Sequence, residues 1–109
     1  MIIEEQNING AVLVGVHEKR LTASVSAEFK QAMGDVINKG CPHLVVDFSG
    51  VEFMDSSGLG ALVAVRKMVD SEGSLKLCGI NEQVMSLFKL TRMTQIFDIF
   101  DDTDQALAA

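Results

Sequence analysis

Apolar and polar positions along the chain switch between two periods, and the switch predicts the order of strands and helices. Residues 10–17, "GAVLVGVH", form a Val-rich run of strand length after the turn-like "QNING". From Ser24 onward the apolar positions recur every three or four residues, which is the spacing of one helical face. Gly40 tolerates a left-handed cap and Pro42 cannot continue the hydrogen-bond ladder, so the helix should stop there. Residues 1–5 are a candidate edge strand beside the first run.

The rest of the chain repeats this alternation. "HLVVDFS" is typical of a strand covered on both faces, and the helix after it is expected to end near residues 72–73. "SLKLCGI" alternates as a strand does, Asn81 can cap a third helix, and "TQIFDIF" alternates again before a short terminal helix with Asp102 and Thr103 as possible caps. This order predicts the α/β class, with a single mixed or parallel sheet of four to five strands packed against three to four helices. Residues 1–109 are short enough to form a single domain.

Composition and charge argue against several function classes. The 15 acidic residues outnumber the nine basic ones and give a formal net charge of -6, so we expect no direct binding of nucleic acid. No apolar run approaches the ~20 residues of a membrane span, and no signal-peptide pattern is present, so no membrane insertion and a cytoplasmic location are expected. Cys41 and Cys78 lack the spacing of metal ligands or redox pairs and are expected to be ordinary thiols. Neither a metal nor a cofactor is predicted, and both a monomer and a weak dimer fit this composition.

The stretch "VEFMDSSGLGALVAVRK" places polar residues between an apolar run and an apolar helix. Asp55, Ser56, Ser57 and Gly58 would occupy a strand-to-helix loop, where backbone N–H groups without helical partners and the helix dipole favour an anion. A helix cap formed by Asp55 or by one of the serines is the simpler interpretation, and it stays open. Gly58 and Gly60 each cost roughly 1 kcal/mol relative to Ala inside a helix. A close approach by another molecule or by the sheet is therefore expected at this first turn.

The loop lacks the motifs of an enzyme. Met54 and Asp55 stand where a nucleophile elbow requires glycine, and the two histidines, His17 and His43, lie in or beside predicted strands. The chain also contains no GxxxxGK[ST] nucleotide-binding loop. We therefore expect the protein not to be an enzyme. A small enzyme or ligand-binding protein that uses the loop as an anion site is a less favoured alternative.

Residues 45–66, "VVDFSGVEFMDSSGLGALVAVR", resemble the signature of STAS domains, and specifically of bacterial anti-sigma factor antagonists. "RLTASVSAEFK" and "VMSLFKLTRMTQIFDIFDDTDQALA" resemble other parts of the same family, so the resemblance covers nearly the whole chain. It implies the STAS fold and a single STAS domain over residues 1–109. It also implies an anti-anti-sigma factor, which binds an anti-sigma factor and so frees the target of that factor.

The resemblance further implies that Ser56 is phosphorylated by a partner that is both an anti-sigma factor and a serine kinase. The unphosphorylated form would bind this partner, the phosphorylated form would release it, and a serine phosphatase would reset the cycle. Asp55, Ser57, Gly58 and Thr22 would support the phosphorylation loop. A phosphate would add about -1.5 to -2 charges beside Asp55 and make an apolar contact surface costly to desolvate.

Contacts with the partner are expected from apolar residues near the loop, namely Met54, Leu59 and Leu87, although a plain core role is an equal alternative for Leu59 and Leu87. The chain departs from the family pattern in "EKRLT", where Thr22 replaces a common Asp. Thr22 would either form a hydrogen bond near Ser56 or only cap the first helix. A second functional alternative keeps the fold but makes the chain a STAS subunit of a transporter or sensor, bound constitutively and without serine phosphorylation.

Overall fold

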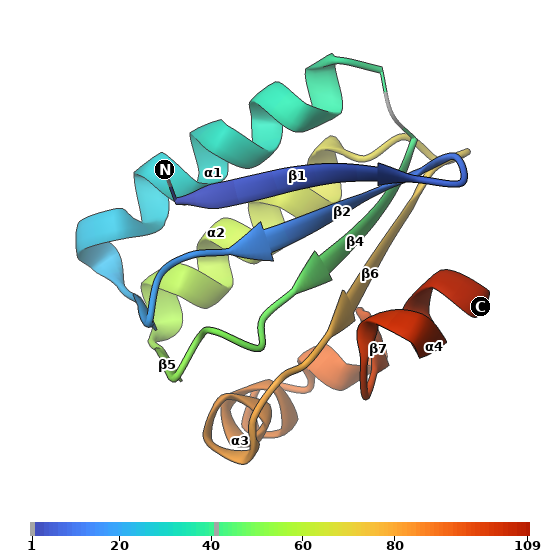
Figure 1. Ribbon diagram of the computed structural model, residues 1–109. Helices are drawn as coiled ribbons and strands as arrows, with labels where there is room; N and C mark the ends of the chain where they lie inside the picture. Colours follow the sequence, from blue (N-terminus) through green and yellow to red (C-terminus); the bar gives the residue numbers. More distant parts are fainter. Residues whose placement is uncertain (1, 41) are drawn as a thin grey trace.

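The computed structural model describes residues 2–40 and 42–109, and Figure 1 shows helices arranged around a central sheet. In chain order the elements are β1 (Ile3–Ile8), β2 (Ala11–Val16), β3 (Arg20–Leu21), α1 (Ala23–Asn38), β4 (His43–Asp47), β5 (Phe53–Met54), α2 (Ser56–Met68), β6 (Ser74–Cys78), α3 (Glu82–Leu90), a 3-10 helix (Met93–Gln95), β7 (Asp98–Phe100) and α4 (Thr103–Ala108). The predicted α/β class is confirmed, since a five-stranded mixed sheet packs against helices.

The central sheet has the strand order β1-β2-β4-β6-β7. β1 is antiparallel to β2, whereas the pairs β2–β4, β4–β6 and β6–β7 are parallel. The predicted edge strand is confirmed as β1, which is joined to β2 by a tight turn. Asn9 and Gly10 in this turn have φ angles of 49° and 86°, as a two-residue turn of the I′ type requires.

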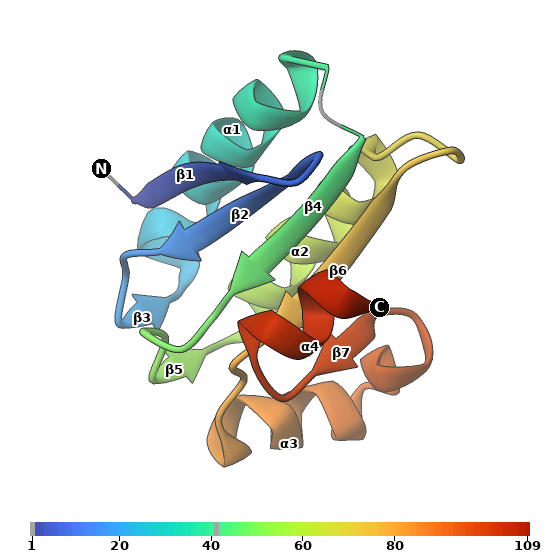
Figure 2. The same ribbon diagram turned by 45° about the vertical axis from the view of Figure 1, so that its right-hand side comes forward.

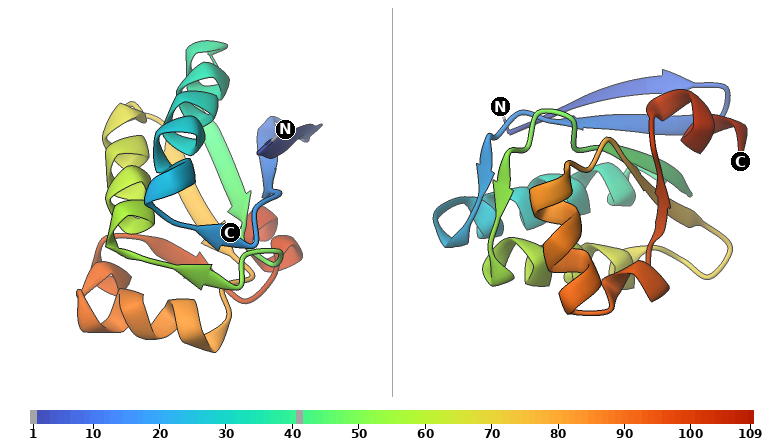
Figure 3. Two further views of the ribbon diagram at one scale, coloured as in Figure 1. Left: turned by 90° about the vertical axis from the view of Figure 1, so that its left-hand side faces the viewer. Right: turned by 90° about the horizontal axis from the view of Figure 1, so that it is seen from below.

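The main core lies between the sheet and the pair α1 and α2, which cover one of its faces (Figure 3). Strand side chains alternate between faces, so Val12, Val14 and Val16 of β2 are buried toward these helices. α4 packs against β4, β6 and β7 on the other face, over a separate small cluster of Val45, Cys78 and Ala106. β4 is therefore covered on both faces, as its uninterrupted apolar run predicted.

Two predicted boundaries were wrong. α2 ends at Met68 rather than near residues 72–73, because Val69 takes an extended conformation with ψ 130° and the chain then turns. The acidic residues that follow would also be unfavourable at the negative end of the helix dipole. "TQIFDIF" is not one strand, because a 3-10 helix occupies Met93–Gln95 and only Asp98–Phe100 pair with β6.

The thiol of Cys78 is free and buried, in agreement with the prediction of an ordinary thiol. Burial raises the pKa of this thiol above its usual value. Cys41 lies outside the described residues. Within residues 2–40 and 42–109, no group of three or more His, Cys, Asp or Glu side chains is arranged to hold a metal ion. No helix in the same ranges combines the length and apolar character of a membrane span.

Candidate functional site

A small two-stranded parallel sheet brings the starts of α1 and α2 together. In this sheet β3 pairs with β5, with Leu21 opposite Met54, and Figure 2 shows the two short strands side by side. Thr22 and Asp55 directly follow the paired residues and are the N-cap residues of α1 and α2. The sequence motif from Asp55 to Gly58 therefore lies beside the start of α1, although the sequence did not predict this second sheet.

Asp55 is confirmed as the cap of α2. Its backbone is extended, and its Oδ1 atom accepts hydrogen bonds from the backbone N–H of Ser57 at 2.9 Å and of Gly58 at 3.0 Å. Its carbonyl oxygen accepts the first helical hydrogen bond, from the N–H of Leu59 at 3.0 Å. Two of the N–H groups that could bind an anion at this helix start are thus already occupied by a carboxylate.

Removing this cap should have a measurable effect on stability. We expect Asp55→Ala to lower the free energy of unfolding by about 1 kcal/mol, because the N–H groups of Ser57 and Gly58 lose their acceptor. Asp55→Asn keeps an oxygen in the same place and should retain most of the stability. Urea unfolding of the two variants and the parent measures the difference. Equal losses in both variants would contradict the capping role and point to the charge instead.

The two serines of the motif have different surroundings. Ser56 is the first residue of α2, and its side chain is exposed. Ser57 is also exposed, but it lines a shallow groove of about 230 Å³ between α1 and α2, together with Lys30 and Gly60. Ser56 does not line this groove. The structure therefore separates a serine that faces outward from one that faces α1.

The close approach expected at the first turn of α2 explains one of its two glycines. Gly58 is buried, and a Cβ atom at this position would overlap the backbone carbonyl oxygen of Leu21 in β3. Gly60 has no neighbour within 4 Å of the equivalent position. The contact that requires glycine thus comes from the small β3–β5 sheet, and packing gives no reason for Gly60.

Thr22 occupies the N-cap position of α1, where its carbonyl oxygen accepts hydrogen bonds from the N–H of Val25 at 3.0 Å and of Ser26 at 2.9 Å. Its hydroxyl lies 3.2 Å from the hydroxyl of Ser24 and caps no backbone N–H. Thr22 therefore caps α1 through its backbone carbonyl group, and its side chain takes no part in the cap.

The residues expected to contact a partner differ in exposure. Met54 and Leu59 are only 5% and 6% exposed and belong to the core. Leu87 on α3 is half-buried. Leu59 is thus a core residue, and of the three side chains that of Leu87 is the most accessible to a partner. The side chain of Leu90, at the end of the same helix, is 84% exposed.

The sequence contains a signal for the exposure of Leu90. Val84, Leu87 and Phe88 form the apolar stripe of α3. At 3.6 residues per turn Leu90 lies next to Leu87, about 60° around the axis, but about 120–160° from Val84 and Phe88, which are the buried residues of the helix. An apolar residue outside the buried stripe of a short amphipathic helix is expected to face solvent. The side chain of Ile96 is 40% exposed. Its exposure was not predicted, because Ile96 belongs to the segment "TQIFDIF", which was expected to form a strand.

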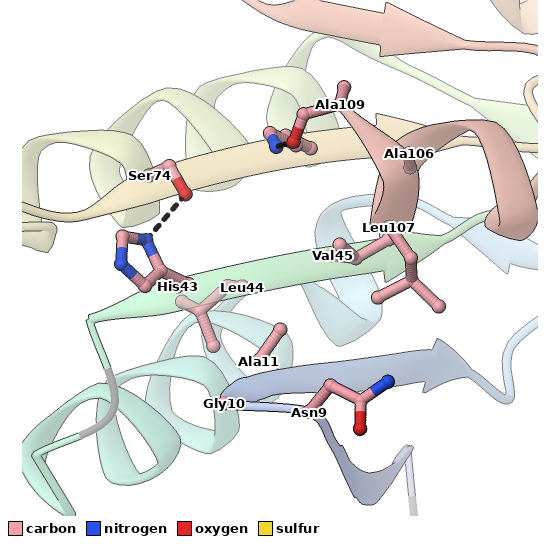
Figure 4. A pocket seen from close by; sticks show the side chains of 11 residues that line it. Asn9, Gly10, Ala11, His43, Leu44, Val45, Ser74, Ala106, Leu107 and Ala109 are labelled. Atoms are coloured by element: carbon pink, nitrogen blue, oxygen red, sulfur yellow. Dashed lines mark hydrogen bonds between the residues drawn. The ribbon is translucent and has the colours of Figure 1, made fainter.

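A separate cavity lies away from Ser56. It measures about 420 Å³ and lies between α4, the β1–β2 turn and the first residues of β4 and β6 (Figure 4). At its edge Nδ1 of His43 is 2.9 Å from the hydroxyl of Ser74. The other histidine, His17, has its Nε2 atom 3.8 Å from a carboxylate oxygen of Glu4. Both histidines thus have polar neighbours other than Ser56, which gives no support to a serine nucleophile.

Comparisons with known proteins agree with the fold and the motif. The anti-sigma F factor antagonist of Paenibacillus polymyxa is 28% identical over 107 residues, which cover 96% of this chain and 91% of that protein. The crystal structure of an anti-sigma factor antagonist from Mycobacterium paratuberculosis superposes with a TM-score of 0.90 at 25% identity, covering 97% of this chain and 90% of the other. The phosphorylated form of the Bacillus cell fate determinant SpoIIAA has the same fold, with a TM-score of 0.71 at 16% identity and coverage of 97% and 96%.

The mixed sheet, its covering helices and the Asp-Ser-Ser-Gly turn at the start of α2 define a STAS domain. The chain belongs to the STAS domain family, whose sequence profile matches residues 3–106. The resemblance noted from residues 45–66 is confirmed over almost the entire sequence.

Proposed function

We propose that this protein is an anti-sigma factor antagonist, controlled by phosphorylation of Ser56. The unphosphorylated form binds an anti-sigma factor that is also a serine kinase, and phosphorylation by that kinase releases it. A serine phosphatase restores binding. Residues 1–109 act as a single STAS domain in the cytoplasm, and the protein serves as substrate and binding partner rather than as an enzyme.

The observation that carries the proposal is the position of Ser56. Its side chain is exposed at the first helical residue, so a kinase can reach the hydroxyl without unfolding the domain. The neighbouring Asp55 carboxylate already accepts the N–H groups of Ser57 and Gly58. A phosphate on Ser56 would therefore find these donors occupied and would add its charge beside an existing carboxylate. The combined negative charge would face the partner, which favours release.

The relatives support the same role. The Paenibacillus polymyxa protein, which matches along most of this chain, is named as an anti-sigma F factor antagonist. SpoIIAA, which shares the fold, has been solved in a phosphorylated form, so a phosphoryl group is compatible with this architecture. The first point favours an antagonist over a constitutively bound subunit, and the second is consistent with control by phosphorylation.

Mapping of the phosphate tests the assignment of the serine. After incubation with ATP and a candidate anti-sigma factor kinase, we expect the intact mass to rise by one phosphoryl group, located on Ser56 by fragment-ion sequencing. Ser56→Ala should take up none, because Ser57 faces the groove beside α1. Phosphate on Ser57, or unchanged uptake by Ser56→Ala, would contradict the assignment.

A further inference from the structure

Exposed apolar side chains and three exposed cations lie at and beside the C-terminal end of α3. Of the three large hydrophobic side chains that are exposed among the described residues, two lie here, Leu90 at 84% and Ile96 at 40% exposure. The third, Met68, is 42% exposed and lies at the end of α2, against α1. We call this surface the Leu90 patch, and it consists of Leu90, Met93, Ile96, Arg66, Lys89 and Arg92.

Hydrogen bonds hold the parts of the Leu90 patch together. Nε of Arg66 in α2 donates to the carbonyl oxygen of Ile96 at 3.1 Å, which ties the segment after α3 to α2. The N–H of Ile96 donates to the carbonyl oxygen of Met93 at 3.0 Å, and the N–H of Arg92 donates to that of Lys89 at 3.2 Å. The patch is therefore a built surface on two helices and not a loose loop.

The charge of the patch is opposite to that of the protein. The whole chain carries a formal charge of -6, yet Arg66, Lys89 and Arg92 are all exposed here. The cavity that Arg66 and Ile96 line also includes Asp70 and Asp98, so two carboxylates lie at its edge, against three cations in the patch. Cations interact favourably with the negative end of the helix dipole. This interaction explains in part why Arg66 and Lys89 occur in the last turns of α2 and α3. It does not account for the exposed Leu90, which contributes little to the core.

We propose that the Leu90 patch docks an acidic segment with an apolar face, carried by the anti-sigma factor partner. The identity of that partner rests on the proposed function, whereas the chemistry of the segment rests on the patch. Leu90 and Ile96 supply the apolar contact, and the three cations select carboxylates around it. A protein segment fits better than an anionic membrane, because a short segment meets only the patch while a membrane surface would face the full negative charge of the domain.

The docking contact is independent of the phosphorylated serine. Ser56 and Arg66 stand ten residues apart on α2, which corresponds to about 15 Å along the helix axis. This separation is roughly twice the Debye length of ~8 Å at physiological ionic strength. A phosphate on Ser56 therefore acts on the partner near the start of α2 but leaves the attraction at the patch nearly unchanged. The patch would retain the partner weakly after the main contact has been released.

A synthetic helical peptide of Leu and Glu, with its leucines on one face, tests the chemistry directly. Titrated into ¹⁵N-labelled protein, it should shift the amide signals of residues 89–96 and of Arg66, and a matched peptide with Gln for Glu should bind at least about fivefold more weakly. Leu90→Ala should lower the affinity roughly fivefold or more, whereas Met68→Ala, which removes another exposed side chain, should not. Shifts confined to other residues, equal binding of the Gln peptide, or tighter binding to phosphatidylglycerol vesicles would overturn the proposal.

Binding to the anti-sigma factor kinase separates this inference from the proposed function. Leu90→Ala is expected to weaken binding by the same factor in the Ser56 protein and in Ser56→Asp, because the two contacts are independent. If Leu90→Ala weakens binding while Ser56→Asp has no effect, the docking patch stands and the phosphorylation switch fails. If Ser56→Asp weakens binding while Leu90→Ala has no effect, the switch stands and the docking patch is overturned.

Discussion

Ser56→Asp is expected to weaken binding of the anti-sigma factor kinase at least tenfold, which corresponds to about 1.4 kcal/mol. The substitution places a second carboxylate beside Asp55, whose own oxygen already accepts the N–H groups of Ser57 and Gly58. The new carboxylate cannot accept hydrogen bonds from these two N–H groups, because Asp55 already does so. A partner that covers it must therefore remove its hydration shell. Ser56→Ala adds no charge and should retain the affinity of the parent. Isothermal titration calorimetry with the purified kinase measures all three.

Ser57→Asp is the matched control for this prediction. It adds the same charge one residue further along, at a position that lines the groove between α1 and α2 near Lys30. We expect a much smaller loss of affinity than for Ser56→Asp, because the added carboxylate faces α1 rather than the partner. Similar losses for both variants would show that net charge at the helix start, and not the position of Ser56, controls binding.

Gly58→Ala is expected to destabilise the domain by roughly 2–3 kcal/mol, through overpacking. A methyl group at this position would overlap the carbonyl oxygen of Leu21, which belongs to the backbone of β3 and cannot rotate away. To make room, α2 or the small β3–β5 sheet must shift, and both position the Ser56 loop. Thermal or urea unfolding measures the loss, and binding of the kinase should fall in parallel.

Gly60→Ala provides the control within the same helix. Apart from its chain neighbours and the backbone of its own helix, no atom lies within 4 Å of the position that its Cβ atom would take, and the residue is exposed. We expect this variant to be more stable than the parent by about 0.5–1 kcal/mol, since Ala is the better helix former. A loss of stability in Gly60→Ala would mean that helix propensity does not govern this turn. A Gly58→Ala variant as stable as the parent would show that β3 yields to the methyl group.

Much of the fold could be predicted from local patterns. The helical spacing of apolar residues from Ser24 onward predicted α1, and Phe29, Met33 and Val36, which follow this spacing, are buried in the structure. Asn81 was expected to cap α3, and its side-chain oxygen accepts a hydrogen bond from the N–H of Val84 at 2.8 Å. Helix stripes and caps depend on residues within a few positions of each other, so the sequence records them directly.

Other features could not be predicted, because they depend on pairing between distant segments. β3 and β5 have only two residues each, too few for a periodic pattern, and they form because Arg20 and Leu21 pair with Phe53 and Met54. The end of α2 and the division of "TQIFDIF" were also missed. Only Asp98–Phe100 pair with β6, whereas the first residues of the segment belong to a 3-10 helix. The alternation of apolar and polar residues therefore does not mark a strand over its whole length.

By itself, the sequence determined the order of strands and helices and the family motif, since residue types and short spacings encode both, and the resemblance to the family then singled out Ser56 as the candidate switch. The tertiary structure alone decided what surrounds them. It showed that Asp55 already binds the N–H groups at the start of α2, that Gly58 must make room for β3, and that Leu90 is exposed. Exposure and close approach arise from contacts between segments far apart in the chain, which local periodicity does not record.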